Sequence, residues 1–156
     1  MATEKNKKRV KLKPPSFENR KARFEYTLLD EYNCGIKLLG SEIKSIRNSN
    51  ASISEAYCYM NKGELFIKNM HIAEYKDSIE PHEPLRDRKL LLTKKEILKI
   101  EYSLKTSGLT LVPTYMYFRR GLVKLKVRLA KGKKLYDKRE SIKKKDVERD
   151  LRREGM

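Results

Sequence analysis

The stretch LTLVPTYMYFRRGLVKLKVRLAKG, residues 109–132, decides the fold of this chain. Its first half is rich in aromatic and β-branched residues, Arg119-Arg120-Gly121 supplies a turn, and its second half alternates between apolar and basic residues. The apolar set is Val123, Leu125, Val127 and Leu129, and the basic set is Lys124, Lys126 and Arg128. Because side chains alternate across a strand, the pattern predicts a long hairpin with one core face and one basic face.

Two earlier segments also predict strands. Residues 24–39, FEYTLLDEYNCGIKLL, carry aromatic and β-branched residues around a turn-like DEYNCG, which predicts strand, bend and strand. Residues 56–70 place two apolar runs around Asn61-Lys62-Gly63, which predicts a hairpin with a positive φ at Gly63. Residues 75–88 contain two prolines and no apolar period, so we expect a loop there.

Two helices are expected between these strands. In GSEIKSIRNSN, residues 40–50, Ser41 is a candidate N-cap of a short helix. Thr93 and Glu96 fit a capping box, and Gly108 stands where a C-terminal cap belongs. Five or six strands with one late helix, without regular β-α-β alternation, indicate a mainly β fold. We expect an antiparallel β-barrel of the oligonucleotide-binding kind, closed or nearly closed.

The composition points to a polyanionic partner. The chain has 156 residues with 38 Lys and Arg against 21 Asp and Glu, a formal net charge of +17. The basic ladder of residues 124–128 could be an ordinary solvent face, but Arg119, Arg120, Tyr115 and Tyr117 beside it favour RNA binding.

Both ends of the chain are basic and poor in apolar residues. We expect a disordered arm at residues 1–16, an RNA-binding barrel at 17–130 and a basic tail at 131–156. The tail holds 11 basic and 6 acidic residues, and its Glu-Lys and Glu-Arg pairs four apart favour a helix that forms only on a partner.

Little in the sequence suits catalysis. His71 and His82 stand alone, there is no phosphate-binding loop, and the carboxylates of Asp30, Glu31 and Glu42 lack a second acidic cluster for a metal-dependent nuclease. We therefore expect no enzyme activity, no cofactor, no metal and no small-molecule substrate.

The remaining patterns concern compartment and assembly. Cys34 and Cys58 are not spaced for zinc and are expected to be reduced core thiols, which favours the cytoplasm. No segment is apolar over the ~20 residues of a membrane span. We expect a monomer.

Four stretches resemble one family: NRKARFEY (19–26), GIKLLGSEIKSIR (35–47), RDRKLLL (86–92) and AKGKKLYDKR (130–139). In this order and spacing they are similar to the bacterial SsrA-binding protein (SmpB) family, partners of transfer-messenger RNA. The resemblance implies a barrel that holds the tRNA-like domain of that RNA, and a tail that becomes helical in the vacant decoding site and mRNA channel of a stalled ribosome.

The same resemblance implies site residues. Those for transfer-messenger RNA, to which we add the ladder Lys124, Lys126 and Arg128, are Asn19, Arg20, Lys21, Asn33, Gly35, Glu42, Lys44, Arg86, Arg88, Lys89 and Leu91. Those of the tail in the decoding site are Lys131, Gly132, Lys133, Lys134, Tyr136, Asp137, Lys138 and Arg139. Asn33 stands where the family often has Glu. The alternative interpretation is a basic structural ribosomal protein with a similar barrel.

Overall fold

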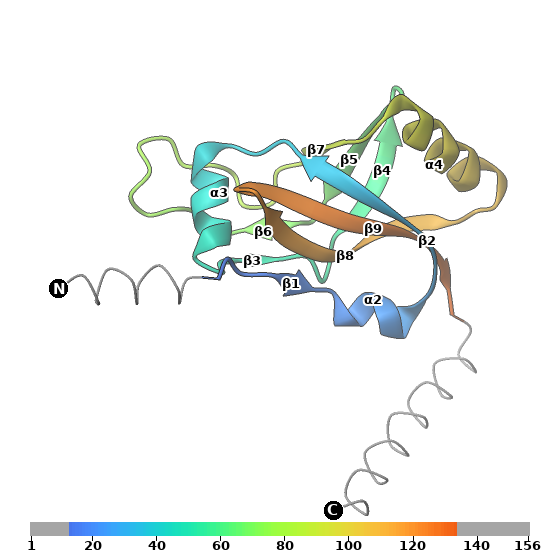
Figure 1. Cartoon of the computed structure of the whole chain (residues 1–156), viewed down its shortest axis with the longest axis horizontal. Coiled ribbons are helices and arrows are strands. Elements are labelled where there is room, and N and C mark those ends of the chain that lie inside the picture. The colour runs from blue at the N-terminus through green and yellow to red at the C-terminus, as the bar shows by residue number, and fades with distance from the viewer. Residues whose placement is uncertain (1–12, 134–156) are drawn as a thin grey trace, which may run out of the picture.

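The computed structural model describes residues 13–133 as a mainly β fold with few helices (Figure 1). The strands are β1 (Phe17–Glu18), β2 (Tyr26–Ile36), β3 (Ala51–Ser52), β4 (Tyr57–Asn61), β5 (Glu64–Lys68), β6 (His71–Ile72), β7 (Arg88–Leu91), β8 (Thr110–Arg119) and β9 (Leu122–Gly132). The helices are α2 (Arg20–Glu25), α3 (Gly40–Arg47) and α4 (Lys94–Thr106). The predicted N-terminal arm at 1–12 and the tail from residue 134 lie outside the described residues.

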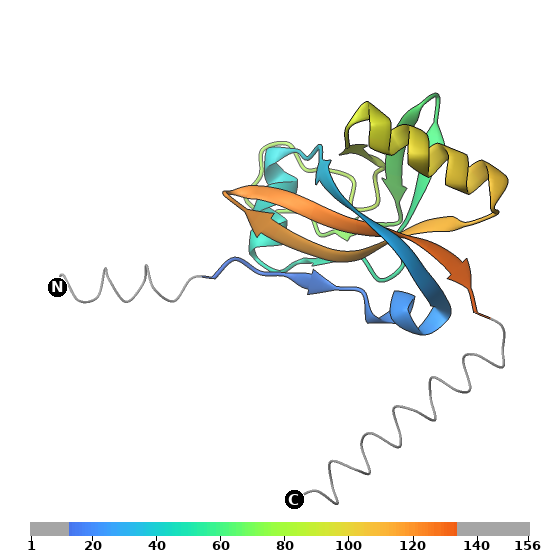
Figure 2. The ribbon, with the colours of Figure 1, turned by 45° about the vertical axis from the view of Figure 1, so that its right-hand side comes forward.

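Six antiparallel strands pair in a closed circuit. The order is β8, β4, β5, β7, β2 and β9, and β9 pairs back onto β8. The short β1 pairs with β8 at Tyr115 and Met116, and β3 pairs with β6 in a separate two-stranded sheet. In both views α3 and α4 lie near opposite ends of this arrangement (Figures 1 and 2).

The hairpin of β8 and β9 confirms the alternation seen in the sequence. Arg120 and Gly121 both have positive φ, as a two-residue hairpin turn that matches the strand twist requires. The four apolar side chains of β9 from Val123 to Leu129 are buried, and the three basic ones between them are partly exposed. The β4–β5 hairpin turns in the same way, with φ of 50° at Lys62 and 78° at Gly63.

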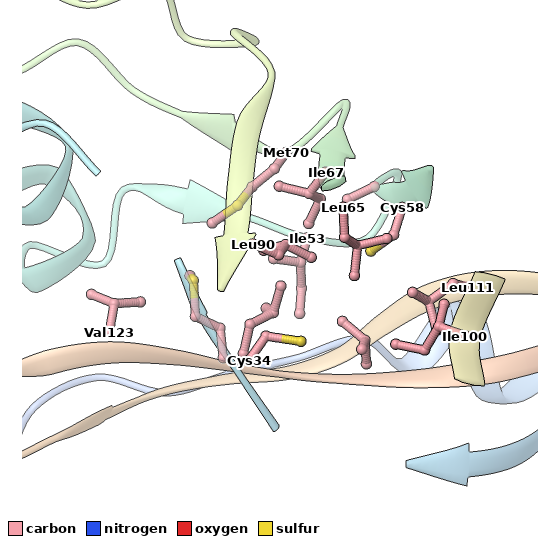
Figure 3. Packing of buried hydrophobic residues seen from close by; sticks show 14 of the residues in the cluster. Cys34, Ile53, Cys58, Leu65, Ile67, Met70, Leu90, Ile100, Leu111 and Val123 are labelled. Atoms are coloured by element: carbon pink, nitrogen blue, oxygen red, sulfur yellow. The ribbon is translucent and has the colours of Figure 1, made fainter. Parts of the chain in front are cut away.

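The core lies inside the circuit of strands. Figure 3 shows Cys34, Leu65 and Leu90 pointing into one apolar cluster that also receives Ile100 from α4. Cys34 and Cys58 are both free and buried, as expected, and burial raises the pKa of the Cys34 thiol to about 12.

The predicted bend in residues 24–39 is wrong. The segment forms the end of α2 and one continuous strand, β2, whose register against β9 shifts between Leu28 and Glu31. At this shift Arg128 of β9 bonds to the backbone of β2: its Nε donates to Leu29 O at 2.8 Å. A β-bulge whose backbone accepts a hydrogen bond from the neighbouring strand therefore stands in place of the predicted bend.

Helix α2 was not predicted, and its cap explains why it forms. Asn19 Oδ1 accepts from the Ala22 amide at 3.1 Å, which caps the helix, while Nδ2 donates to Pro113 O at 2.8 Å and to Ile53 O at 3.2 Å. The Asn19 side chain is buried and ties α2 to two distant segments.

The two predicted helices form, with one correction. Thr93 and Glu96 make the expected capping box of α4, and Gly108 has φ of 60° beyond its end. In α3 the N-cap is Leu39 rather than Ser41: Glu42 Oε1 accepts from the Leu39 amide at 2.8 Å. Ser41 lies inside the helix, where its hydroxyl bonds to His82 Nδ1 at 2.9 Å.

Candidate nucleic-acid interface

The basic ladder of β9 lies beside two stacked tyrosines of β8. The rings of Tyr115 and Tyr117 have centroids 5.6 Å apart with an interplanar angle of 24°. Lys126 Nζ lies 5.8 Å and 5.7 Å from these two centroids, within the range of cation–π attraction. One cation and two aromatic faces are thus held together on a rigid sheet.

Strand β2 supplies the other border of this surface. Asn33 pairs with Lys126 in register, and Tyr117 Oη lies 3.5 Å from Asn33 Oδ1. Glu31 Oε1 is 3.6 Å from Lys126 Nζ, and both side chains are about 40% exposed, so solvent weakens this ion pair. Lys126 therefore remains available to an anionic partner.

Gly35, Leu91 and Lys124 meet at the next step along β9. Gly35 pairs with both Leu91 and Lys124, and a Cβ at Gly35 would lie 3.3 Å from Leu91 Cβ. These residues line a hollow, and its rim includes Leu91, 48% exposed, and Leu122, 62% exposed. The hollow offers apolar surface beside a cation, which suits an unstacked base next to its phosphate.

Glu42 and the buried Arg88 form a clamp with Arg86, whose side chain is 31% exposed. Arg86 donates two hydrogen bonds to the Glu42 carboxylate, the shorter at 2.6 Å, and Arg88 Nε donates to the same group. Arg88 also donates to Met70 O and Pro84 O. Glu42 and Arg88 have no exposed side-chain surface.

The clamp governs the protonation of its members. Burial opposes ionisation of Glu42, but the hydrogen bonds from Arg86, the Leu39 amide and Arg88 prevail and lower its pKa. Burial lowers the pKa of Arg88, and Glu42 counteracts the effect. Three of the predicted RNA-contacting residues, Asn19, Glu42 and Arg88, are thus buried in this structure.

The other predicted residues of the RNA set are spread over the surface. Arg20 and Lys21 are exposed on α2, where Lys21 Nζ pairs with Glu55 at 2.6 Å. Lys44 Nζ on α3 lies 5.4 Å from the ring of Tyr75, a contact that the sequence pattern did not suggest. Lys89 Nζ pairs with Glu64 at 3.2 Å on the β5–β7 surface. None of these is part of the group around Lys124 and Lys126.

The predicted tail begins inside the sheet. Lys131 and Gly132 are the last residues of β9 and pair with Thr27 and Tyr26, so β9 extends two residues beyond the expected boundary at 130. The Lys133 amide donates to Glu25 O at 3.1 Å. The predicted decoding-site residues Lys134, Tyr136, Asp137, Lys138 and Arg139 lie outside the described residues.

Two features of residues 13–133 bear on the remaining expectations. No group of three or more His, Cys, Asp or Glu side chains gathers as a metal site would require in this part of the chain. No helix there has the length and apolar character needed to span a bilayer.

Comparisons with known proteins agree on one family. A family model described as SmpB protein matches residues 16–156. The SsrA-binding protein of Wolbachia pipientis is 54% identical over 138 residues, 87% of this chain and 93% of the relative. That of Bacteroides thetaiotaomicron is 54% identical over 146 residues, 91% of this chain and 97% of the relative.

A solved structure is similar over most of the fold. It is called "tmRNA-SmpB: a journey to the center of the bacterial ribosome", and one of its chains matches with a TM-score of 0.65 and 41% sequence identity. The match covers 78% of this chain and 86% of that one.

Proposed function

Because the chain belongs to the SmpB protein family, we propose that it is an RNA-binding adaptor of trans-translation. It binds the tRNA-like domain of transfer-messenger RNA and delivers this RNA to stalled ribosomes in the cytoplasm. The closed circuit of six strands acts as an oligonucleotide-binding barrel. The tail after residue 133 occupies the vacant decoding site and mRNA channel. Nothing in this role requires a cofactor or catalysis.

One observation carries the RNA-binding half of this proposal. A single surface carries the stacked rings of Tyr115 and Tyr117, with Lys126 over both. It extends past Lys124 to the apolar hollow at Leu91. Aromatic faces stack with bases and lysines contact phosphates, so this surface, the ladder face, can hold a folded RNA loop. The similarity to SsrA-binding proteins supports transfer-messenger RNA as the ligand.

Asn33 completes the polar contacts of the ladder face. Its exposed amide lies between Tyr117 and the β9 ladder and can both donate and accept hydrogen bonds. Glu, which the family often has at this place, only accepts and adds a negative charge. An amide therefore suits contact with a base edge close to phosphates, without charge repulsion.

We predict that replacing Lys124 and Lys126 by Ala weakens binding to the tRNA-like domain and flattens its salt dependence. Each lost phosphate contact removes about 0.7–0.9 from the slope of log affinity against log salt. The measurement is a titration of the RNA transcript at several salt concentrations.

The matched control replaces Lys62 and Lys68, exposed lysines of the β4–β5 hairpin, and should leave the slope unchanged. Cooperative unfolding of both variants would show that the barrel is intact. An unchanged slope in the Lys124 and Lys126 variant would refute the ladder face. Equal binding to every translating ribosome, with no preference for transfer-messenger RNA, would favour the structural ribosomal protein.

A further inference from the structure

A groove between α4 and β2 exposes apolar and basic side chains that the proposed interface leaves unused. On α4, Leu98 is 56% exposed and Tyr102 is 70% exposed, and the two lie one turn apart. The groove, a hollow of about 450 Å³, is lined by Asp30, Tyr32, Lys95, Leu98, Lys99, Tyr102 and Ser103. On the opposite side of α4, Ile100 is buried in the core. This contact anchors the helix, and Leu98 and Tyr102 face outward.

This groove lies on the other side of β2 from the ladder face. Asn33 pairs with Lys126 of the basic ladder, whereas Tyr32 pairs with Val127, which points into the core. Adjacent strand residues point to opposite faces, so Asn33 borders the ladder face and Tyr32 borders the groove. Figure 2 shows α4 above the β8–β9 hairpin, with α2 below it. The two surfaces can therefore hold different partners at the same time.

The lining of the groove has two lysines, Lys95 and Lys99, against one acid, Asp30, and this excess of positive charge favours an anionic partner. Lys95 and Lys99 are exposed, and neither has an ion-pair partner among residues 13–133. The acids of the same helix are engaged: Glu96 belongs to the capping box, and Glu101 pairs with Lys105 at 2.8 Å. Two unpaired cations thus remain beside the exposed ring of Tyr102 in this part of the chain.

We propose that the α4 groove is a second RNA-binding surface, which takes a segment of ribosomal RNA while the ladder face holds the tRNA-like domain. Lys95 and Lys99 contact successive phosphates, and one base stacks on Tyr102 with its edge against Leu98. Asp30 can accept a hydrogen bond from an exocyclic amine of that base. The groove repeats the combination of tyrosine and lysine found at Tyr115, Tyr117 and Lys126.

The proposal rests on the proposed function, and the experiment separates the two. The probes are a transcript of the tRNA-like domain and purified ribosomes stalled on a truncated message. Tyr102→Ala is expected to bind the transcript as the wild type does, whereas the affinity of its complex with transfer-messenger RNA for stalled ribosomes falls about tenfold. Tyr102→Phe should retain that affinity, because the ring remains.

The lysines give an independent test. Lys95→Ala with Lys99→Ala should weaken ribosome binding and its salt dependence, whereas Lys94→Ala with Lys105→Ala, on the same helix but outside the groove, should not. Unchanged ribosome binding in the groove variants overturns the proposal, and so does a loss of transcript binding in parallel. Failure of the wild type to bind the transcript would instead refute the proposed function.

A photoreactive phenylalanine analogue at position 102 identifies the occupant. Crosslinks from the stalled complex into ribosomal RNA support the proposal. Crosslinks into a ribosomal protein overturn it in favour of a protein partner.

Discussion

Replacing Glu42 by Gln is expected to destabilise the fold by about 3–5 kcal/mol, the cost of removing one partner of a buried ion pair. The glutamine side chain has nearly the same volume, but it would leave the guanidinium of Arg88 buried without a counter-charge. The carboxylate also holds Arg86 and caps α3 through the Leu39 amide. The measurement is equilibrium unfolding in urea. The slope of the unfolding free energy against urea concentration is compared with that of the wild type.

The matched control is Glu64→Gln, which breaks the ion pair with Lys89 at the surface. Both partners are 39–50% exposed, so this change should cost at most about 1 kcal/mol. If Glu42→Gln costs no more than Glu64→Gln, the three residues are not an energetic clamp.

The same clamp predicts a pH dependence. The pKa of Glu42 is lowered in the folded protein, so the folded state favours the ionised carboxylate. This stability is fully present above the pKa of the unfolded state, ordinarily 4.5, and is lost as the pH falls through the folded pKa. The stability difference between the wild type and Glu42→Gln should therefore shrink below pH 4.5. A difference that stays constant in urea unfolding down to pH 3, about 1.5 units lower, would contradict this.

The elements predicted correctly have local causes. Strand β9 alternates along its own sequence, the turns at Gly63 and Gly121 need residues that tolerate positive φ, and α4 has a capping box at Thr93. Each signal lies within a few residues of the element it specifies. The mainly β class followed because these signals are spread along the chain.

The elements that were missed depend on distant partners. Helix α2 lacks an apolar stripe and is fixed by Asn19, whose amide bonds to carbonyls 34 and 94 residues away. The predicted bend in β2 is a bulge because Arg128 reaches across from β9, 99 residues later. No local pattern contains either contact.

The candidate site was predictable only in part for the same reason. Alternation identified Lys124 and Lys126 as exposed, and Tyr115 and Tyr117 as their neighbours across the hairpin. The resemblance named Glu42, Arg86 and Arg88, but the two arginines are 44 and 46 residues away from Glu42, and only the structure shows that they bind it. The α4 groove was missed because the sequence around Tyr102 is typical of an ordinary exposed helix face.

Ending the chain after Lys133 is expected to abolish peptide tagging while binding to transfer-messenger RNA remains within about twofold of the wild type, since the lysines proposed to contact its phosphates are all kept. The cut keeps all of β9 and the Lys133 amide bond to Glu25, whereas a cut after Ala130 would remove two paired residues of that strand. The ladder face and its hollow remain intact. The lost segment holds 9 of the basic residues proposed to occupy the ribosomal channel.

The matched control carries the same residues after Lys133 in a shuffled order, which preserves length and charge. If the tail acts through specific residues such as Tyr136 and Arg139, the shuffled protein should bind transfer-messenger RNA normally and still tag poorly. The assay is tagging on ribosomes stalled at a truncated message, beside a binding titration and a melting curve for each protein. Full tagging by the shortened chain would show that the tail does not read the channel. Full tagging by the shuffled chain alone would reduce its role to unspecific attraction between positive charge and ribosomal RNA.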